Sequence, residues 1–524
     1  MKRRHLLAAA GAAALPLPAF AQDAAARTLR VIPQANLTSL DPVWTTAVVT
    51  RNHAAMVYDQ LVGVDENMVA KPQMVAGWAQ EDGGKSWTFT LRDGLKFHDN
   101  EPVRAEDCVA SIKRWMARDT IGQTLAERLD EVAALDDKRF RFRLKKPFPS
   151  LLDALAKPEV SPLFIMPARI AATDPFQQIR DPIGSGPFRF VREEWNPGQL
   201  AVWTKFDGYV PRDDAPSATA GRKQAAADRV EWTIIPDPST AAAAIANGEH
   251  DYWEYPLHDL LPTLRRNRNV VVQQRLANGF YGFCRFNHLH PPFNNKAVRQ
   301  AVMMAADQRD YLRAVAGEDP AGWGECPSFF TCGTPASVMG GQEALQQRSM
   351  DRARQALKAA GYNGEKTVLI TPSDYPQINA LSLVTADLLQ RMGFNLEIVA
   401  ADWGTVVQRR ASREPVEKGG WSVFHTTAGG GALINPALNQ FTRTNGLNAW
   451  FGWPTDGEME RLRLDWFDAD GAEQMKIAQA IQTRALDVVP YVPLGFYWQP
   501  SVWRSNVTGV TKNFITSFWN IGKN

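Results

Sequence analysis

The chain has 524 residues, with 58 basic and 56 acidic side chains and a formal net charge of +2. Residues 1–21 hold three of the basic residues and none of the acidic ones. The rest of the chain is therefore almost neutral, which gives no reason to expect nucleic acid or an anionic membrane as a partner. It is also too long for one simple domain.

The first 21 residues have the composition of a secretory signal peptide. Three basic residues open the chain, a short apolar run covers residues 6–17, and Ala19-Phe20-Ala21 supplies a small-residue cleavage site. The apolar run is too short to remain as a membrane span. No Cys follows it for lipid attachment, so we expect a periplasmic protein that is not itself membrane-embedded. The pair Arg3-Arg4 leaves twin-arginine and ordinary Sec export both open.

The first predicted elements are two strands and a helix. Apolar and polar residues alternate over 87–91, which predicts a half-buried strand. Asp93-Gly94 signals a turn, and the alternation over 95–97 predicts a second strand. Helical spacing of apolar residues over 106–116 predicts an amphipathic helix. Residues 140–144 alternate again and predict a further strand.

Two later stretches predict strand–helix–strand units. The first covers residues 230–253, with a helix that stops at Gly248. The second covers residues 367–399, with a helix that stops at Gly393. Such units build parallel sheets through right-handed crossovers, so we expect α/β architecture.

The four cysteines divide into a pair and two single residues. Cys326 and Cys332 lie close together in a loop, and in an exported protein this spacing predicts a disulfide. Cys108 and Cys284 are predicted to be buried free thiols. A zinc site would need further ligands nearby, and the sequence offers none at suitable spacing. We therefore expect no metal and no cofactor.

Several sequence blocks resemble one family, in the same order along the chain. Residues 87–100 read W-T-F-T-L-R-D-G-L-K-F-H-D-N, and residues 182–188 read P-I-G-S-G-P-F. Residues 292–301 read P-F-N-N-K-A-V-R-Q-A, and residues 489–494 read V-P-Y-V-P-L. With these blocks the chain resembles the family 5 solute-binding proteins of ABC importers, the dipeptide-, oligopeptide- and nickel-binding type.

The resemblance implies an α/β fold of two lobes, the class II type of periplasmic-binding-protein fold, with an additional α+β domain inserted in the first lobe. The implied limits are residues 22–55, 182–277 and 497–524 for lobe I, 56–181 for the extra domain and 278–496 for lobe II. It further implies that a small solute binds in the cleft between the lobes. The partners would be that solute and the membrane subunits of an ABC permease, and we expect a monomer.

The cleft residues follow from the same resemblance. The strand 279–287 is expected to cross between the lobes, with one face toward the cleft, either the face of Tyr281 or that of Phe280. Trp403 follows Asp402 in a D-W pair near the cleft, and the aromatic side chains suit a flat, apolar or cationic ligand. The candidate contacts are Tyr281, Phe283, Arg285, Trp403, His425, Thr426, Thr427, Trp450 and Trp498.

Residues 421–436 depart from the family pattern. Peptide binders of the family place an Asp here that holds the peptide's α-ammonium group, whereas this stretch contains no acid. Gly429, Gly430 and Gly431 stand there instead, and they allow either close backbone approach to a ligand or a featureless surface loop. Asp402 could supply the carboxylate from elsewhere.

The predicted function is capture of a small peptide-like or amino-acid-derived solute for an ABC permease, without catalysis. One alternative is nickel-chelate binding, for which His288 and His290 are the only closely spaced histidine pair. A secreted hydrolase is the other, but the sequence has no H-E-x-x-H motif and no G-x-S-x-G elbow.

Overall fold

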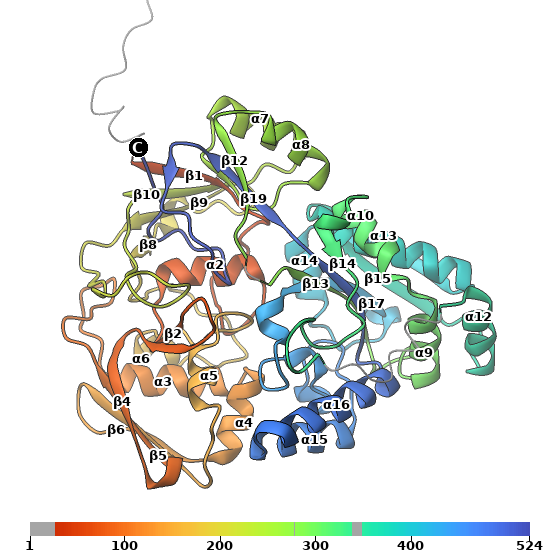
Figure 1. The fold of residues 1–524 in the computed structure, drawn as a ribbon, viewed down its shortest axis with the longest axis horizontal. Helices are drawn as coiled ribbons and strands as arrows, with labels where there is room; N and C mark the ends of the chain where they lie inside the picture. Colours follow the sequence, from red (N-terminus) through yellow and green to blue (C-terminus); the bar gives the residue numbers. More distant parts are fainter. Residues whose placement is uncertain (1–26, 277, 338–347) are drawn as a thin grey trace, which may run out of the picture.

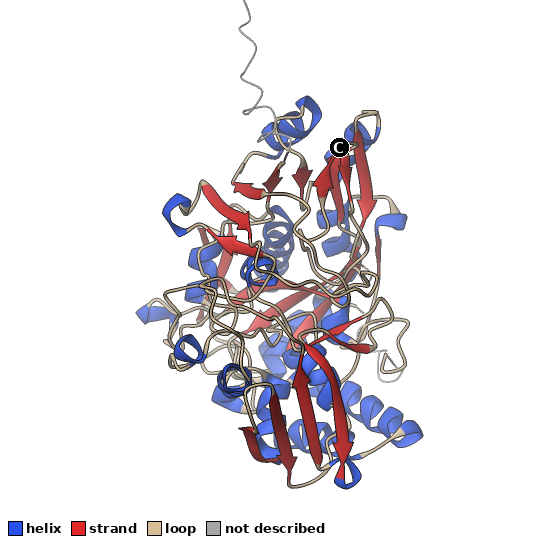
Figure 2. Ribbon diagram, turned by 90° about the vertical axis from the view of Figure 1, so that its left-hand side faces the viewer, coloured by secondary structure: helices blue, strands red, loops and turns tan. Residues whose placement is uncertain are grey.

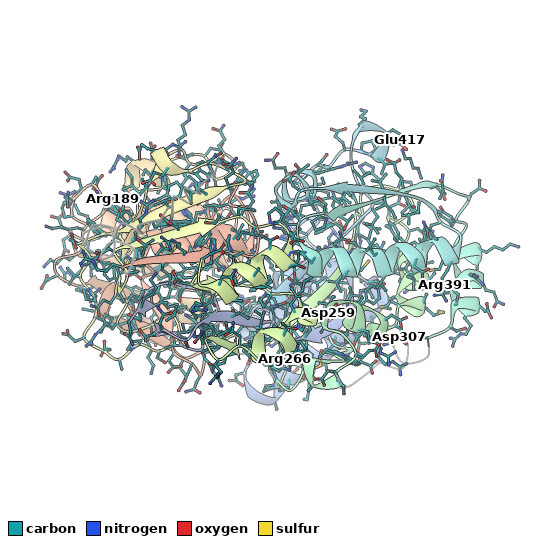
Figure 3. The ribbon with its side chains drawn as sticks, turned by 90° about the horizontal axis from the view of Figure 1, so that it is seen from above. Arg189, Asp259, Arg266, Asp307, Arg391 and Glu417 are labelled. Atoms are coloured by element: carbon teal, nitrogen blue, oxygen red, sulfur yellow. A yellow bond between two sulfur atoms is a disulfide. The ribbon has the colours of Figure 1, made fainter. Side chains whose placement is uncertain are left out.

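The computed structural model describes residues 27–276, 278–337 and 348–524. The predicted signal peptide, residues 1–21, lies outside the described residues. Three sheets organise the rest of the chain, at the upper left, the right and the lower left of Figure 1. Seen from above, Arg189 lies on one half of the molecule, whereas Arg391 and Glu417 lie on the other (Figure 3).

The first sheet has seven strands and draws on distant parts of the chain. In spatial order they are β12 (Val270–Gln274), β19 (Pro500–Arg504), β11 (Tyr252–Trp253), β1 (Thr28–Ile32), β10 (Arg229–Thr233), β9 (Leu200–Lys205) and β8 (Phe188–Phe190). β10 and β11 both run parallel to β1, and α7 (Pro238–Asn247) connects them. Asp237 caps the start of α7, and Gly248 ends it in the left-handed conformation. The predicted unit over 230–253 is confirmed.

The second sheet has six strands. In spatial order they are β14 (Trp323–Gly324), β18 (Tyr491–Tyr497), β13 (Phe280–Phe286), β17 (Val423–Gly429), β15 (Lys366–Pro372) and β16 (Asn395–Ala401). β15 and β16 run parallel, joined by α13 (Pro376–Met392), which ends at a left-handed Gly393. The second predicted unit is therefore confirmed. β13 is central, because β17 and β18 both pair with it, and all of its residues are buried.

The third sheet is antiparallel, and Figure 2 shows its four strands side by side at the bottom. In spatial order they are β4 (Val75–Glu81), β5 (Ser86–Leu91), β7 (Arg139–Leu144) and β6 (Leu129–Ala134). α3 (Ala105–Met116) follows as predicted. The predicted strand at 95–97 is wrong: only an isolated bridge joins Lys96 to Pro102, because β4 and β7 occupy both edges of β5.

The remaining elements connect and cover these sheets. The other helices are α2 (Val48–Val57), α4 (Thr120–Arg128), α5 (Leu151–Ala156), α6 (Ala168–Ala171), α8 (Leu261–Arg265), α9 (Lys296–Ala305), α10 (Gln308–Ala316), α12 (Met350–Ala359), α14 (Trp403–Arg409), α15 (Gly457–Asp468) and α16 (Gly471–Val488). Two short hairpins pair β2 (Val62–Val64) with β3 (Ala70–Pro72) and β20 (Val507–Thr508) with β21 (Gly522–Lys523). In the described part of the chain, no helix is long and apolar enough to cross a membrane.

The chain passes twice between the first and second sheets. One passage leads from β12 to β13, and the other from β18 to β19. α2 lies near the centre of the molecule and is buried along nearly its whole length. The third sheet uses residues that precede β8 of the first sheet, and the second sheet uses residues between β12 and β19 of the first sheet. The exact limits of the lobes and of the extra domain stay a prediction.

Two glycines of the P-I-G-S-G-P-F block fix a loop against the end of α2. A Cβ on Gly184 would lie 2.0 Å from the carbonyl oxygen of Val57, and one on Gly186 would lie 2.4 Å from that of Met56. Only glycine allows backbone to approach backbone this closely. The block therefore has a packing role in this structure.

The four cysteines lie as a bonded pair and two buried thiols. A disulfide joins Cys326 to Cys332. The backbone N–H of Cys332 donates to the hydroxyl of Tyr281, which ties this loop to β13. Cys108 and Cys284 are buried and free.

Candidate functional site

A small cavity is lined by three separate stretches of the chain. Its walls come from residues 34–51 near β1 and α2, from Glu159 and Val160, and from residues 375–450 around the second sheet. Its volume is about 30 Å³, which is room for only one or two water molecules. A solute would therefore enter only when the walls stand further apart than in this structure.

One wall carries a buried carboxylate next to a buried guanidinium. Glu159 is 5% exposed, and its Oε2 lies 3.8 Å from Nη1 of Arg51 on α2. Burial raises the pKa of Glu159 to about 7, against the opposing effects of the Arg51 charge and of backbone hydrogen bonds from Gly431 and Gly429. This carboxyl group can therefore take up or release a proton near neutral pH.

The glycine-rich segment lies directly against that carboxylate. A Cβ on Gly429 would lie 2.0 Å from Oε2 of Glu159, and one on Gly431 would lie 2.6 Å from Oε1. Gly429, Gly430 and Gly431 are all buried, so the alternative of a featureless surface loop is wrong. The close approach that these glycines allow is made to Glu159, which belongs to a different part of the chain.

The wall formed by residues 375–450 carries a second buried guanidinium, that of Arg410. This side chain is 1% exposed, follows α14 directly and is surrounded by aromatic rings. Its guanidinium carbon lies 4.9 Å from the ring centroid of Phe451, 5.4 Å from that of Trp450 and 5.5 Å from that of Trp403. Burial lowers the pKa of Arg410 to about 9. The aromatic cluster therefore already holds a cation from the protein itself.

Four of the predicted contact residues line the cavity: Trp403, Thr426, Thr427 and Trp450. Trp403 is 4% exposed, and its indole Nε1 has no hydrogen-bond partner in the described residues. Trp450 donates from Nε1 to the hydroxyl of Thr46, at 3.3 Å. Thr46 precedes α2, so this bond joins two walls that are distant in sequence. These four residues remain candidates for contact with a solute.

The three predicted residues of β13 do not line the cavity. Arg285 donates to the carbonyl oxygens of Phe451, Phe441, Pro490 and Trp450, at 2.7 to 3.2 Å. Phe283 packs edge-on against the ring of Tyr491, and Tyr281 stacks on Phe496. No residue of β13 lines the cavity, and all seven are buried inside the protein, so neither face of the strand meets the cavity.

His425, Trp498 and Asp402 are also absent from the lining of the cavity. The ring nitrogens of His425 pair with the hydroxyls of Ser382 and Thr385 on α13, and burial lowers its pKa to about 3. Trp498 lines a separate groove beside β12. Asp402 caps α14 by accepting from the backbone N–H of Thr405, at 3.0 Å. It also lines a second pocket, which shares Gln34 with the cavity, so the idea that Asp402 replaces the absent acid of the segment 421–436 stays a prediction.

Sequence reasoning missed the three charged residues of the cavity, Arg51, Glu159 and Arg410. Glu159 follows Lys157-Pro158 in irregular chain, where no periodic pattern marks a site. Arg410 comes second in an Arg pair at a helix end, which has the appearance of an ordinary solvated terminus. A helix that is buried all round would have been the one available signal for Arg51.

The histidine pair shows no metal-site geometry. Nε2 of His290 pairs with the carbonyl oxygen of Arg413, at 2.8 Å. Within the described ranges, no group of three or more His, Cys, Asp or Glu side chains is placed to hold a metal ion.

A cavity enclosed by two lobes that are joined by two chain passages defines the class of solute receptors that close around a ligand. Residues 69–446 match the family described as bacterial extracellular solute-binding proteins, family 5, middle part. A probable peptide ABC transporter periplasmic-binding protein of Sinorhizobium fredii is 36% identical over 535 residues, covering 100% of this chain and 99% of that protein. The chain therefore belongs to the family 5 extracellular solute-binding proteins, as its sequence blocks predicted.

Solved structures confirm the predicted fold class. The PBP AgaA of A. tumefaciens R10, in complex with agropinic acid, gives a TM-score of 0.77 at 22% identity, covering 95% of this chain and 99% of that one. A dipeptide-binding protein of Pseudoalteromonas in complex with Met-Leu gives 0.76 at 21% identity, covering 95% and 100%. At such identities the likeness establishes the two-lobed fold alone.

Proposed function

We propose that this protein is the periplasmic receptor of an ABC importer for a small peptide-like or amino-acid-derived solute. The observation that carries the proposal is the cavity between the lobes, which combines buried charges with aromatic walls in a member of this family. The peptide ABC transporter assignment of the Sinorhizobium relative supports the solute class. Solute would favour the closed arrangement by contacting both lobes, and the closed form would then dock on the permease.

Glu159 is our candidate for the group that receives the solute's amino group. The family's peptide binders use an Asp in the segment that here contains Gly429, and this chain brings a carboxylate to the same segment from a different part of the sequence. A buried ammonium needs an anionic acceptor, because its desolvation is otherwise costly. Glu159 would thus supply, from another part of the chain, the carboxylate that this segment lacks.

The proposal extends to export and assembly. We infer that residues 1–21 are removed on export to the periplasm, by either the Sec or the twin-arginine route, and that the mature protein acts as a monomer. The relatives named above are binding proteins, and no turnover of the solute is proposed.

A thermal-shift screen of refolded mature protein tests the solute class. The panel would contain di- to pentapeptides, amino-acid derivatives, opines, polyamines and nickel chelates. We expect a peptide-like or amino-acid-derived solute to raise the melting temperature with increasing concentration. Stabilisation by nickel chelates alone, abolished by EDTA, would replace this proposal with metal-chelate uptake. Progressive cleavage of a bound solute would instead indicate a hydrolase.

A further inference from the structure

Arg410 differs from the other buried arginines in what surrounds its charge. Arg114 pairs with Asp41 at 2.8 Å, and Arg443 pairs with Glu460 at 2.9 Å. Other buried arginines, such as Arg285, Arg299 and Arg463, donate to backbone carbonyl oxygens. The described contacts of the Arg410 guanidinium include neither an acid nor a backbone carbonyl.

The guanidinium of Arg410 has one weak acceptor in the described part of the chain. Nη2 lies 3.4 Å from the hydroxyl oxygen of Thr46, and Nε has no hydrogen-bond partner. A buried cation without a counter-charge costs several kcal/mol of desolvation, so a fold keeps one only where something offsets that cost. The surrounding aromatic rings offset part of it. Because Arg410 lines the cavity, its guanidinium is a candidate donor to a ligand there.

The balance of charge in the cavity is positive. Arg51 and Arg410 contribute two guanidinium groups to its walls, and Glu159 contributes one carboxyl group, which already lies near Arg51. A cationic solute would therefore meet Arg410 without compensation. A carboxylate would meet the planar fork of donors that arginine presents, which matches a carboxylate in two parallel hydrogen bonds.

A groove that adjoins the cavity is lined by two further arginines. This groove shares Thr46 and Trp450 with the cavity, has a volume of about 130 Å³ and is lined by Arg118 and Arg413. Arg118 lies over the ring of Phe176, at 4.7 Å, and neither arginine has a described acid within ion-pair distance. Clustered charge of one sign along a groove raises the local concentration of ligands of opposite sign.

We propose that Arg410 is the carboxylate receptor of this cavity, so that the solute is a zwitterion or an anion with a carboxylate rather than a cation or a neutral molecule. This inference rests on the proposed function and narrows its solute class. It assigns the aromatic cluster a second role, because Trp403, Trp450 and Phe451 hold the guanidinium of Arg410 in place. The cluster would thus orient a carboxylate-binding arginine instead of stacking on a cationic ligand.

The test compares acid and amide forms of one probe on three proteins. The probes are Met-Leu and its C-terminal amide, with agropinic acid as a second carboxylate and spermidine as a cation. The proteins are the wild type, Arg410→Met and Arg409→Met, each refolded and measured by isothermal titration calorimetry. Arg409 is the matched control, because it neighbours Arg410 but donates to the carbonyl oxygen of Gly420 and does not line the cavity.

We expect the wild type and the Arg409→Met protein to bind a carboxylate probe with similar affinity. Arg410→Met should weaken that binding by about 30-fold or more, since a hydrogen bond to a charged group is lost. Between the acid and the amide of Met-Leu, the wild type should prefer the acid, and Arg410→Met should remove the preference. An equal loss for acid and amide would overturn the inference, and so would binding of spermidine with neither carboxylate bound.

Failure of the solute class can be told apart from failure of this inference. If no probe binds the wild type, the peptide-like or amino-acid-derived solute class loses its support. The stability of ligand-free Arg410→Met then decides the role of Arg410. A receptor arginine without a structural partner should be replaceable, with a melting temperature close to that of Arg409→Met. A drop of several degrees relative to that control would make Arg410 a structural residue and overturn the inference.

Discussion

Glu159 offers a direct physical test of the cavity, because its charge should set part of the pH dependence of stability. We consider the substitution Glu159→Gln, which keeps the shape of the side chain and removes its ionisation. The carboxyl group is 5% exposed, and burial raises its pKa to about 7. The ordinary pKa of a glutamate side chain, 4.5, serves as its value in the unfolded chain. Folding therefore opposes ionisation of Glu159.

The sign of the effect follows from linkage. A carboxyl group whose pKa is higher in the folded state contributes full stability below the unfolded value, and this stability is lost as pH rises through the folded value. One unit of pKa corresponds to about 1.4 kcal/mol, so ionisation should cost the wild type about 2.5 kcal/mol between pH 5 and pH 8. The Gln variant lacks this term and should lose less stability over the same range.

The measurement is urea unfolding followed by tryptophan fluorescence, on both proteins at pH 5 and pH 8. The quantity of interest is the difference between the two proteins, since all other titrating groups are shared. Glu417→Gln is a suitable control, because Glu417 is exposed, does not line the cavity and lies at the outer edge of the molecule (Figure 3). If the difference between wild type and Glu159→Gln stays constant from pH 5 to pH 8, the assignment of a raised pKa to Glu159 is wrong.

Two further substitutions separate binding from folding. Gly429→Ala would place a methyl group 2.0 Å from Glu159 Oε2. This clash should oppose closure of the lobes and weaken solute binding about tenfold or more. Gly77→Ala is the control and should leave binding unchanged, because a Cβ on Gly77 would have nothing within 4 Å. Equal solute affinities of these two variants in calorimetry would contradict a close contact between Gly429 and Glu159 in the ligand-bound form. Arg285→Met should lower the free energy of unfolding by about 3 kcal/mol, because several buried carbonyl oxygens lose a charged donor. The folded variant should keep its solute affinity, and a selective loss of affinity would place Arg285 in the binding site.

The sequence predicted the local elements well wherever a periodic pattern met a clear stop. The unit from β15 to β16 has an apolar first strand, a helix with one buried side and a glycine that adopts the left-handed conformation at Gly393. These features act within a few residues, so local sequence is enough to specify them. The strand predicted at 95–97 was wrong, because strand formation depends on more than local sequence. Whether an alternating stretch becomes a strand depends on a free partner edge, and β7 had taken that edge.

The binding site was predicted less well, because its members meet only in the folded chain. Trp403 and Trp450 line the cavity. Arg285 and His425, which are polar residues on strands, instead form hydrogen bonds with buried groups of the protein. A buried polar side chain must find a partner, and its sequence does not say whether that partner is a ligand or the protein's own backbone.

The sequence by itself determined the family, the α/β elements and the absence of an acid from the segment around Gly429, since each of these is written in residue order. Only the tertiary structure decided where the cavity's charge lies. It brought Glu159 against Gly429 across 270 positions of sequence and enclosed Arg410 in aromatic rings. Burial then changed what both groups can do, because desolvation, which depends on all the surrounding chain, sets the pKa of a carboxyl group and the need of a guanidinium for a counter-charge.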